Sequence, residues 1–415
     1  MFNLLQNVNW LFFLNNKGFA NANLTSISSI LQKVIHPQLQ KMMAKKVLLL
    51  DKVKRNVRTT IANDNVYISA ANQYHSGFYS AAEGTQPKVG RGTYIQMQAA
   101  LKFIFMTYGF TDQALTLAAK QGKEAIAGTF DAELDVGKIT GAKQMNRILH
   151  GDATGKLCLA NGAGVATTAL VVDGCPAVGG TANHTKYLAP GQHIHIGTTA
   201  AEISTVDSTT GVTLASAVSW SDNDVITLLN DAEPMGLAGH IDDGDNIATY
   251  QNLSRTTYPM LKAQVDDTAE ALTEADMIAV VVKACEYGDG PDCALMNQDL
   301  WQKYMALLLS MKRSVDMKDL VGGAKGLSLN VGTKEIPVLC DYDTWDGYVQ
   351  FPRFSGFTIA EATEMFEWMA GYDGKGDVLR RSPDGRTDWE GTQKWYMQFC
   401  GLQVNDMARL RAKTT

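Results

Sequence analysis

One stretch constrains the fold of this chain more than any other: Thr93 to Tyr108, sixteen residues without glycine or proline. Apolar residues alternate with polar or small ones throughout it, at Ile95, Met97, Ala99, Leu101, Phe103 and Phe105. Alternation with a period of two predicts one half-buried strand. At about 3.3 Å per residue this strand would be roughly 50 Å long, whereas most strands have five or six residues.

A second run of strand-forming residues precedes it. Val66, Tyr67 and Ile68 begin a run that ends near Tyr79, and turn-forming residues follow from Glu83 to Gly92. The two runs predict a two-stranded ribbon with a turn-rich tip. An isolated ribbon is unstable in water, so it needs a surface to lie on, and a neighbouring subunit would supply one. The alternative is a long central hairpin within a large sheet.

Charge is divided unevenly along the chain. The formal net charge is −6, which argues against a dedicated nucleic-acid-binding protein. Residues 1–60 carry a net +8, however, and the remainder carries −14. The basic residues of this arm are Lys17, Lys33, Lys41, Lys45, Lys46, Lys52, Lys54, Arg55 and Arg58. A basic arm on an acidic body indicates contacts with another subunit or segment. The competing partner is DNA, whose phosphates the last six of these residues would contact.

Cysteine usage and hydropathy indicate a protein made in a reducing cytoplasm. The six cysteines are dispersed without a C-x-x-C pair, as expected for buried thiols. The most apolar N-terminal run, Trp10 to Leu14, is far shorter than the roughly 20 residues of a transmembrane helix. It also lacks the flanking features of a signal peptide. We therefore expect no membrane contact.

The rest of the chain divides into three further segments. Apolar residues recur at helical spacing from Leu115 to His150, after Thr111 and Asp112 as candidate N-caps. The glycines of this segment predict either a break near Gly128 or one long helix supported by packing, with Gly151 as the stop. From about Leu159 to Asn230 short β-branched runs alternate with turn residues, which predicts a small all-β module.

The third segment is predicted to be mixed α/β. Thr273 and Asp276 form a capping signal for a helix that stops by Gly288, and a second helix is expected from Asp299 to Arg313. The predicted strands are Asp292–Met296, Leu327–Leu329, Glu335–Asp341, Tyr348–Phe351 and Lys394–Val404.

This order of segments resembles the major capsid proteins of tailed phages, which have the Hong Kong 97-type fold. Three stretches carry the resemblance besides the order itself: Gly236 to Pro259, Pro291 to Asn297, and Ile336 to Asp343 paired with Lys394 to Val404. The likeness covers roughly residues 20–410, and its weight lies in the ordered set of features. It implies an α+β fold with an N-terminal arm (1–60), an E-loop ribbon (61–110), a P-domain spine helix (111–158), an inserted β-domain (159–232), an A-domain (233–345) and closing P-domain strands that return to the A-domain (346–415). The β-domain is absent from the minimal fold, although several relatives carry insertions.

The resemblance implies a structural protein that assembles into hexamers and pentamers of an icosahedral head shell around double-stranded DNA. The expected location is the virion capsid, assembled in the cytoplasm of the host bacterium. The arm is too short for a fused scaffolding domain, so we expect a separate scaffolding protein, together with a portal and a decoration protein as further partners and non-specific contact with the packaged DNA. Contacts between subunits are predicted at the E-loop tip (Glu83, Lys88, Arg91) and in the arm (Lys52, Lys54, Arg55, Arg58).

Motifs for chemistry are weak, and we predict no catalytic, cofactor or metal site. His193 and His195, with His184 nearby, could bind zinc, but surface histidines are the simpler interpretation. Cys285 and Cys293 would pair only if oxidised. The glycine-rich turn at 321–326 lacks P-loop order, and the acidic turns at 241–246 and 372–377 lack EF-hand spacing. Two other functions stay open: a nanocompartment shell protein with the same fold, and a carbohydrate-binding or hydrolytic protein that displays the β-module.

Overall fold

The structure is a computed structural model that describes residues 47–55, 60–72, 75–86, 89–113, 123–179, 183–228, 233–310, 318–319, 325–332, 334–369, 379–381 and 388–415. The chain divides into two compact units. The described part of the first lies within Phe105–Gly141 and Met365–Lys394, and the second contains nearly all the rest. No helix in the described ranges is long and apolar enough to span a membrane.

The first unit is built around a helix and a sheet. It contains most of β5 (Lys102–Thr111) and of α5 (Lys123–His150), together with β22 (Glu367–Trp368), β23 (Leu379–Arg381) and the first half of β24 (Asp388–Gly401). β5, β22 and β23 all pair with β24. A Cβ on Gly137 of α5 would lie 2.5 Å from the Tyr108 ring, so only glycine lets the helix pack this closely on β5. α5 runs through Gly128 without a break, which decides between the two predicted forms of this helix.

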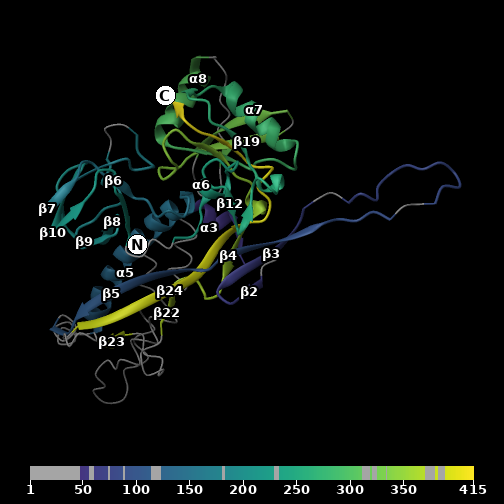
Figure 1. Cartoon of the computed structure of the whole chain (residues 1–415). Coiled ribbons are helices and arrows are strands. Elements are labelled where there is room, and N and C mark those ends of the chain that lie inside the picture. Colours follow the sequence, from purple (N-terminus) through teal and green to yellow (C-terminus); the bar gives the residue numbers. More distant parts are fainter. Residues whose placement is uncertain are drawn as a thin grey trace. The chain divides into compact units, whose positions relative to one another are not determined.

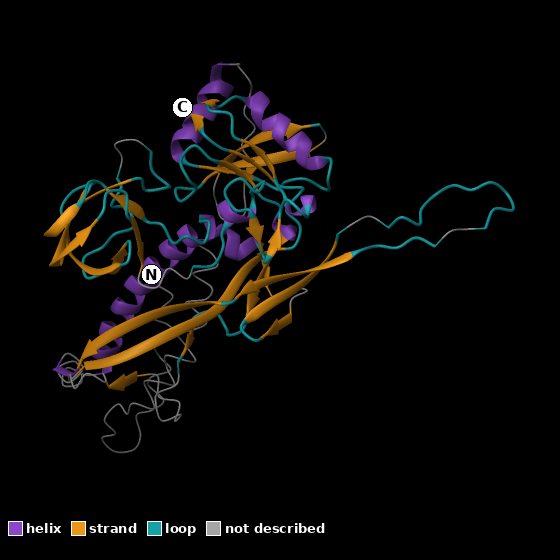
Figure 2. Cartoon of the chain, viewed as in Figure 1, coloured by secondary structure: helices purple, strands orange, loops and turns teal. Residues whose placement is uncertain are grey.

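The second unit contains an α/β domain whose sheet has the strand order β14-β25-β20-β16-β19-β18-β17. Figure 2 shows its two long helices beside this sheet. The strands are β14 (Gln264–Asp266), β25 (Ala408–Leu410), β20 (Val349–Phe351), β16 (Ala294–Met296), β19 (Lys334–Cys340), β18 (Lys325–Val331) and β17 (Lys318–Asp319), and the helices are α7 (Glu274–Cys285) and α8 (Gln298–Ser310).

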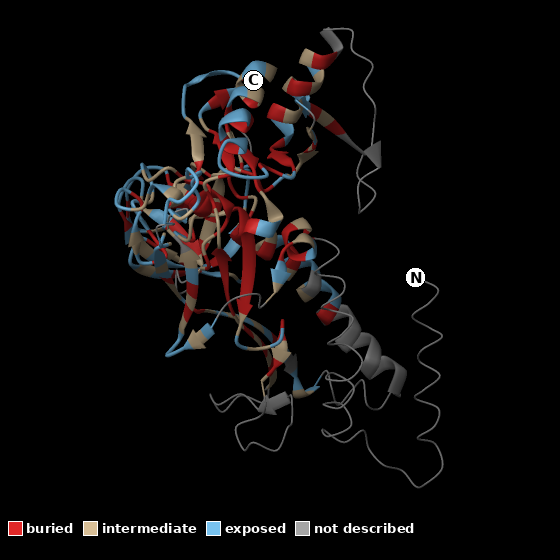
Figure 3. Ribbon diagram, turned by 90° about the vertical axis from the view of Figure 1, so that its right-hand side faces the viewer, coloured by how far each residue is buried: buried red, intermediate tan, exposed pale blue. Residues whose placement is uncertain are grey.

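Sequence signals specify this domain well. Thr273 Oγ1 accepts from Asp276 N at 3.2 Å while the Asp276 carboxylate accepts from Thr273 N, so the predicted capping box is confirmed. Leu300, Tyr304 and Leu308 lie on one face of α8 and are buried against the sheet. Central β16 and β20 are buried on both faces, which fits the apolar sequence of β16 and leaves Gln350 as the one polar side chain enclosed in β20. In Figure 3 the buried parts of the described chain are drawn in red.

A closed barrel of six strands forms a second core in the same unit, in the order β10-β7-β6-β11-β8-β9. The strands are β6 (Cys158–Ala160), β7 (Gly164–Asp173), β8 (His193–Ile196), β9 (Thr199–Val206), β10 (Gly211–Trp220) and β11 (Val225–Leu228). Apolar residues from all six strands, among them Val172, Ile194, Ile203 and Ile226, fill its interior. The six strands lie between Cys158 and Leu228, close to the span of about Leu159 to Asn230 for which the sequence predicts short strands.

The predicted sixteen-residue strand is wrong in its continuity. It is divided at Leu101 into β4 (Tyr94–Ala100), which pairs with β3 (Asn65–Ala71), and β5, which pairs with β24. The Leu101 amide donates to Asp64 O at 2.8 Å and closes the base of the ribbon. The first strand of the ribbon also ends at Ala71 and not near Tyr79. Alternation shows which side chains share a face but not which strand lies alongside, so it could not distinguish one long strand from two strands in different sheets.

The remaining elements are short. They are α3 (Leu48–Lys52), β1 (Lys54–Arg55), β2 (Thr60–Ala62), α6 (Leu237–His240), β12 (Thr249–Tyr250), β13 (Leu253–Ser254), η3 (Pro259–Leu261), β15 (Glu270–Ala271), η4 (Phe354–Gly356), β21 (Phe357–Glu361) and β26 (Lys413–Thr414). β2 adds to the ribbon through a two-residue turn at Asn63 and Asp64, both with positive φ, as tight hairpins require. A helical piece is also expected in the arm from the sequence, around Ile27 to Leu50, and all but its last residues lie outside the described ranges.

Candidate assembly surfaces

The β3–β4 hairpin stays closed well beyond its seven paired residues. The Asn72 amide donates to Thr93 O at 2.7 Å. Farther out, the Ser76 hydroxyl accepts from the Arg91 amide at 3.1 Å and donates to the Arg91 carbonyl at 3.3 Å. These bonds hold the two sides of the hairpin together as far as Ser76 and Arg91, and Figure 1 shows the hairpin reaching away from the sheets.

Two glycines meet just past this point. A Cβ on Gly90 would lie 2.0 Å from the Gly77 nitrogen, a distance that no side chain tolerates. Only glycine therefore permits this close backbone approach. It separates residues 78–89, which we call the terminal loop, from the hairpin below. Within the terminal loop, Thr85 N donates to Ala82 O at 3.1 Å and forms a turn.

The predicted contact residues of the tip lie at different places. Glu83 is exposed in the turn of the terminal loop, Arg91 is exposed at its base, and Lys88 lies outside the described residues. The largest exposed apolar side chains are Phe78, 99% exposed, and Val89, 92% exposed, and each follows or precedes one of the paired glycines. Sequence reasoning on charge missed both. Large apolar residues beside glycines in an otherwise polar loop were the available signal.

The end of the basic arm lies on its own chain. β1 pairs in parallel with β21, and the Thr358 hydroxyl donates to Lys54 O at 3.2 Å. Arg55 Nη1 lies 3.5 Å from Glu361 Oε1. Burial raises the pKa of Glu361, and Arg55 opposes that rise by stabilising the carboxylate. Lys54 is exposed and Lys52 partly buried, while Arg58 lies outside the described residues.

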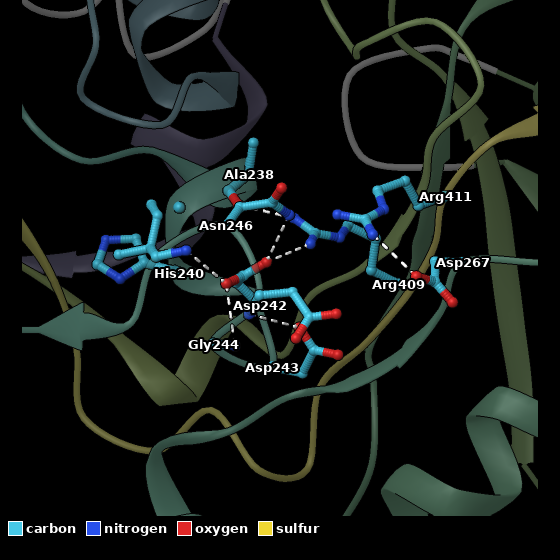
Figure 4. A network of polar contacts seen from close by, with 12 residues as sticks. Ala238, His240, Asp242, Asp243, Gly244, Asn246, Asp267, Arg409 and Arg411 are labelled. Carbon is cyan, nitrogen blue, oxygen red and sulfur yellow. Dashed lines mark hydrogen bonds and ion pairs between the residues drawn. The ribbon is translucent and has the colours of Figure 1, made fainter. Parts of the chain in front are cut away.

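A buried polar network organises the segment from Gly236 to Pro259 (Figure 4). The Asp242 carboxylate, fully buried, lies 3.2 Å from Arg255 Nη1 and 2.5 Å from Arg409 Nη2. It also accepts from the amides of Gly244 and Ile247, both at 3.0 Å. Burial alone would raise the pKa of Asp242, but these donors and the Arg409 guanidinium lower it. The carboxylate is thus committed to two guanidiniums, which leaves it unavailable for the calcium that the 241–246 turn might suggest.

The same guanidiniums fasten backbone from distant parts of the chain. Arg255 Nη2 donates to Gly239 O at 2.9 Å and His240 O at 3.0 Å, and Arg409 Nη1 donates to Ala238 O at 2.7 Å. Burial and the nearby Arg255 charge lower the pKa of His240 to about 3, so its ring is neutral. The network joins the segment around α6 to β25 and reads as structural, because both charges of each pair are enclosed.

Polar contacts also join the barrel to the rest of its unit. Tyr187 OH donates to Asp343 Oδ1 at 2.7 Å, and Lys186 Nζ lies 3.0 Å from the same oxygen. Asn146 of α5 donates to both Asp341 and Asp343, at 2.9 and 2.8 Å. Beneath them His150 Nε2 lies 3.1 Å from Asp341 Oδ2, with the ring fully enclosed. The barrel therefore has an apolar core of its own and a polar contact surface with α5 and the 341–346 loop.

Comparisons with known proteins rest on structure, since no protein-family model and no curated protein sequence matches this chain. The structure is similar to that of a chain in the capsid asymmetric unit of cyanophage A-1(L). The TM-score is 0.51 at 13% identity, over 91% of this chain and 93% of that one. The chain has the fold of a phage capsid subunit. The resemblance to Hong Kong 97-type capsid proteins is confirmed at the level of the fold.

Weaker likenesses to this capsid fold exist in other shells. A chain of the holo-SrpI encapsulin complex from Synechococcus elongatus PCC 7942 has a TM-score of 0.44 at 10% identity, over 88% of this chain and 87% of that one. A chain of the satellite phage P4 procapsid has a TM-score of 0.42 at 9% identity, over 92% of this chain and 100% of that one.

The capsid fold also places the weak chemical motifs. His184 is buried in the barrel, where its Nδ1 accepts from Cys175 N at 3.4 Å, while His193 and His195 lie on β8. Within the described residues no group of three metal-ligating side chains comes together. Cys285 is exposed and Cys293 buried, and both are free thiols. The turn at 372–377 and most of the glycine-rich turn at 321–326 lie outside the described residues.

Proposed function

We propose that this protein is the major capsid protein of a tailed phage, a structural subunit and not an enzyme. Many copies would form hexamers and pentamers of an icosahedral head shell around double-stranded DNA. The observation that carries the proposal is a capsid-type fold from which a closed hairpin projects, ending in two almost fully exposed apolar side chains, Phe78 and Val89. Monomeric proteins rarely expose such side chains at a projecting tip, whereas a shell subunit buries them on assembly.

The finer domain layout belongs to the same proposal. We assign residues 1–60 to the arm, 61–110 to the E-loop, 111–158 to the spine helix, 159–232 to an inserted domain, 233–345 to the A-domain and 346–415 to the closing strands. The barrel supports the assignment of an inserted domain, because its six strands are consecutive in the chain and enclose their own core. At one boundary the strand pairing favours a shorter E-loop: β5, from Lys102 onward, pairs with β24 and not with the ribbon strands β3 and β4.

The proposed contacts between subunits lie at two places, the tip of the E-loop and the N-terminal arm. At the E-loop tip, Phe78 and Val89 would supply apolar contacts, and Glu83, Lys88 and Arg91 would supply the charged rim. In the arm, Lys52, Lys54 and Arg58 would contact acidic surfaces of a neighbour or the packaged DNA. Arg55 differs, since its described acidic partner is Glu361 of the same chain. Scaffolding, portal and decoration proteins are the further partners of this proposal, and the virion is its location.

Electron microscopy of the expressed protein, alone and with the scaffolding protein of its phage, tests the proposal. We expect closed icosahedral shells with hexameric and pentameric capsomers. Only monomers under both conditions would refute it. Shells that contain a protein cargo and never a genome would assign the protein to nanocompartments.

A further inference from the structure

One inner strand of the α/β sheet follows all of its partners in the chain. β25 lies between β14 and β20, parallel to the first and antiparallel to the second. Gln264 N donates to Met407 O at 2.9 Å, and Arg411 N donates to Asp266 O at 2.8 Å. Among the described strands, β14 has no other partner in this sheet. The edge strand is therefore attached only when residues 408–410 are in place.

The side chains of β25 complete the packing on both faces of the sheet. Ala408 and Leu410 are fully buried and belong to the apolar cluster that the sheet shares with α7 and α8. Arg409, which alternates with them, lies on the opposite face. Its Nη2 is 2.5 Å from Asp242 Oδ1, and its Nη1 donates to Ala238 O at 2.7 Å. Without this strand the sheet would be open between β14 and β20, and Asp242 would lose one of its two guanidiniums.

A second fastening lies just beyond β25. The side chain of Lys413 is fully buried, and its Nζ lies 2.7 Å from Glu270 Oε1 and 3.1 Å from Asp266 Oδ2. β26, which begins at this lysine, pairs in parallel with β15, and Leu272 N donates to Thr414 O at 3.1 Å. A buried ammonium group is tolerated only where it is paired, so these carboxylates fix the position of the segment. We call residues 405–415 the strap.

Every strand that pairs with the strap precedes it by a long stretch of chain. β14 and β15 lie between residues 264 and 271, and β20 lies at 349–351. Pairings that close long loops cost more chain entropy than local pairings, so they form later in folding. Pairing is local in other parts of this unit: β18 and β19 form a hairpin, and all barrel strands lie within residues 158–228.

We propose that the strap closes last on the α/β domain and that a subunit becomes competent for assembly only once the strap is seated. Before closure, β14 has no strand beside it, so the domain is not a rigid surface for a neighbour. The barrel, which encloses its own core, stays folded in either state. The claim about assembly rests on the proposed shell function, whereas closure of the strap is a property of the single subunit.

The first test keeps the strap from seating in the full chain. Leu410→Asp places an unpaired carboxylate in the core. In the unassembled subunit, hydrogen exchange should be at least about tenfold faster at Gln264 and Leu272, whose amides donate to the strap, and within about twofold of the original in β7 and β10 of the barrel. No shells should form. The matched control is Ala412→Asp, at an exposed position with a positive φ that aspartate accepts, and it should exchange and assemble normally.

A peptide then distinguishes a missing strap from a damaged subunit. A synthetic peptide with the sequence of residues 404–415 is added to the Leu410→Asp subunit, and it should restore slow exchange at Gln264 and Leu272 together with shell formation. The same peptide carrying Leu410→Asp should restore neither. Failure of the native peptide or normal shells from the Leu410→Asp chain alone would overturn the inference. Fast exchange in the barrel as well would also overturn it, because the strap would then belong to one cooperative core.

Pulse-labelled hydrogen exchange during refolding of the original chain tests the order of closure. Amides of the strap, with Gln264 and Leu272, should become protected at least about tenfold later than those of β18 and β19. Simultaneous or earlier protection contradicts closure as the last step. An original chain that refolds in this order but never forms shells, even with scaffolding protein, would refute the shell function and leave closure of the strap supported.

Discussion

The barrel and the β3–β4 hairpin are both all-β, yet they differ in how far their strands and apolar side chains find partners within the chain. The barrel closes on itself, so each of its strands has two partners, and it buries apolar residues from all six strands. The hairpin leaves Phe78 and Val89 in solvent. A region whose strands are all paired and whose apolar side chains are buried within one chain can serve as a domain. A region that leaves apolar side chains exposed indicates contact with another subunit. The comparison yields four predictions.

The largest effect, a loss of assembly, should come from removing the terminal loop of the hairpin. Replacing residues 78–89 by two glycines should leave the free energy of unfolding within about 0.5 kcal/mol of the original, since every described residue of the loop is exposed. Assembly should be lost, because the exposed apolar side chains go with it. Denaturant unfolding and sedimentation of assembled shells measure the two effects. Thr85→Ala, which keeps the loop, is the control. Normal shells from the shortened chain would show that the terminal loop is not needed for assembly.

A substitution in the core of the barrel should lower the stability of the protein. Ile226→Ala in β11 removes a fully buried barrel side chain and should lower the free energy of unfolding by about 2–5 kcal/mol. The matched control is its neighbour Val225, 39% exposed, where Val225→Ala should cost less than about 1 kcal/mol. Denaturant curves followed by circular dichroism and tryptophan fluorescence provide the measurement. Equal costs would show that the barrel has no tight core.

The stability of the folded chain should depend on pH through His150, which pairs with Asp341 beneath the contact surface of the barrel. Burial lowers the pKa of His150, but the ion pair and hydrogen bond with Asp341 outweigh it, so the pKa is raised. A raised pKa contributes stability that is fully present below the unfolded value of about 6.5 and is lost as pH rises through the folded value. His150→Gln should therefore cost about 3 kcal/mol at pH 6.

The cost of His150→Gln should shrink as pH rises above 6.5 and through the raised pKa of the folded state, because the original protein then loses its own ion pair. Denaturant unfolding between pH 6 and 9.5 tests this. His195→Gln on β8, which is not among the contacts of this network, is the control and should cost less than about 1 kcal/mol at pH 6. A constant cost for His150→Gln would exclude the charged pair.

The smallest effect concerns the arm. Lys52, Lys54 and Arg58 changed to Ala should lower the melting temperature of DNA-free shells at low salt, and the loss should vanish near 1 M salt, where the Debye length is about 3 Å. Each pair contributes at most about 1 kcal/mol. Arg55→Ala should instead weaken the unassembled subunit by about 0.5 kcal/mol, because Glu361 belongs to the same chain. An effect confined to DNA-filled shells would assign the three residues to DNA.

Much of the fold could be predicted because its signals are local. The capping pair Thr273 and Asp276 fixes the start of α7, and the spacing of Leu300, Tyr304 and Leu308 fixes the buried face of α8. The order of segments was sufficient to indicate the capsid fold. The candidate site was less predictable: charge directed attention to Glu83, Lys88 and Arg91, whereas exposure singles out Phe78 and Val89. Exposure depends on what the rest of the chain covers, and no local pattern contains that information.

Periodicity, caps and turn residues act over a few neighbouring positions, so the amino-acid sequence was enough to locate most of the helices and strands. Which elements lie side by side became clear only from the folded molecule. The fold divided the alternating stretch at Leu101 between two sheets, enclosed Asp242 between Arg255 and Arg409, and placed β25 between β14 and β20. Each of these joins residues far apart in the chain. Their pairing is set by the competition among all partners for burial and hydrogen bonds, which is a property of the whole molecule.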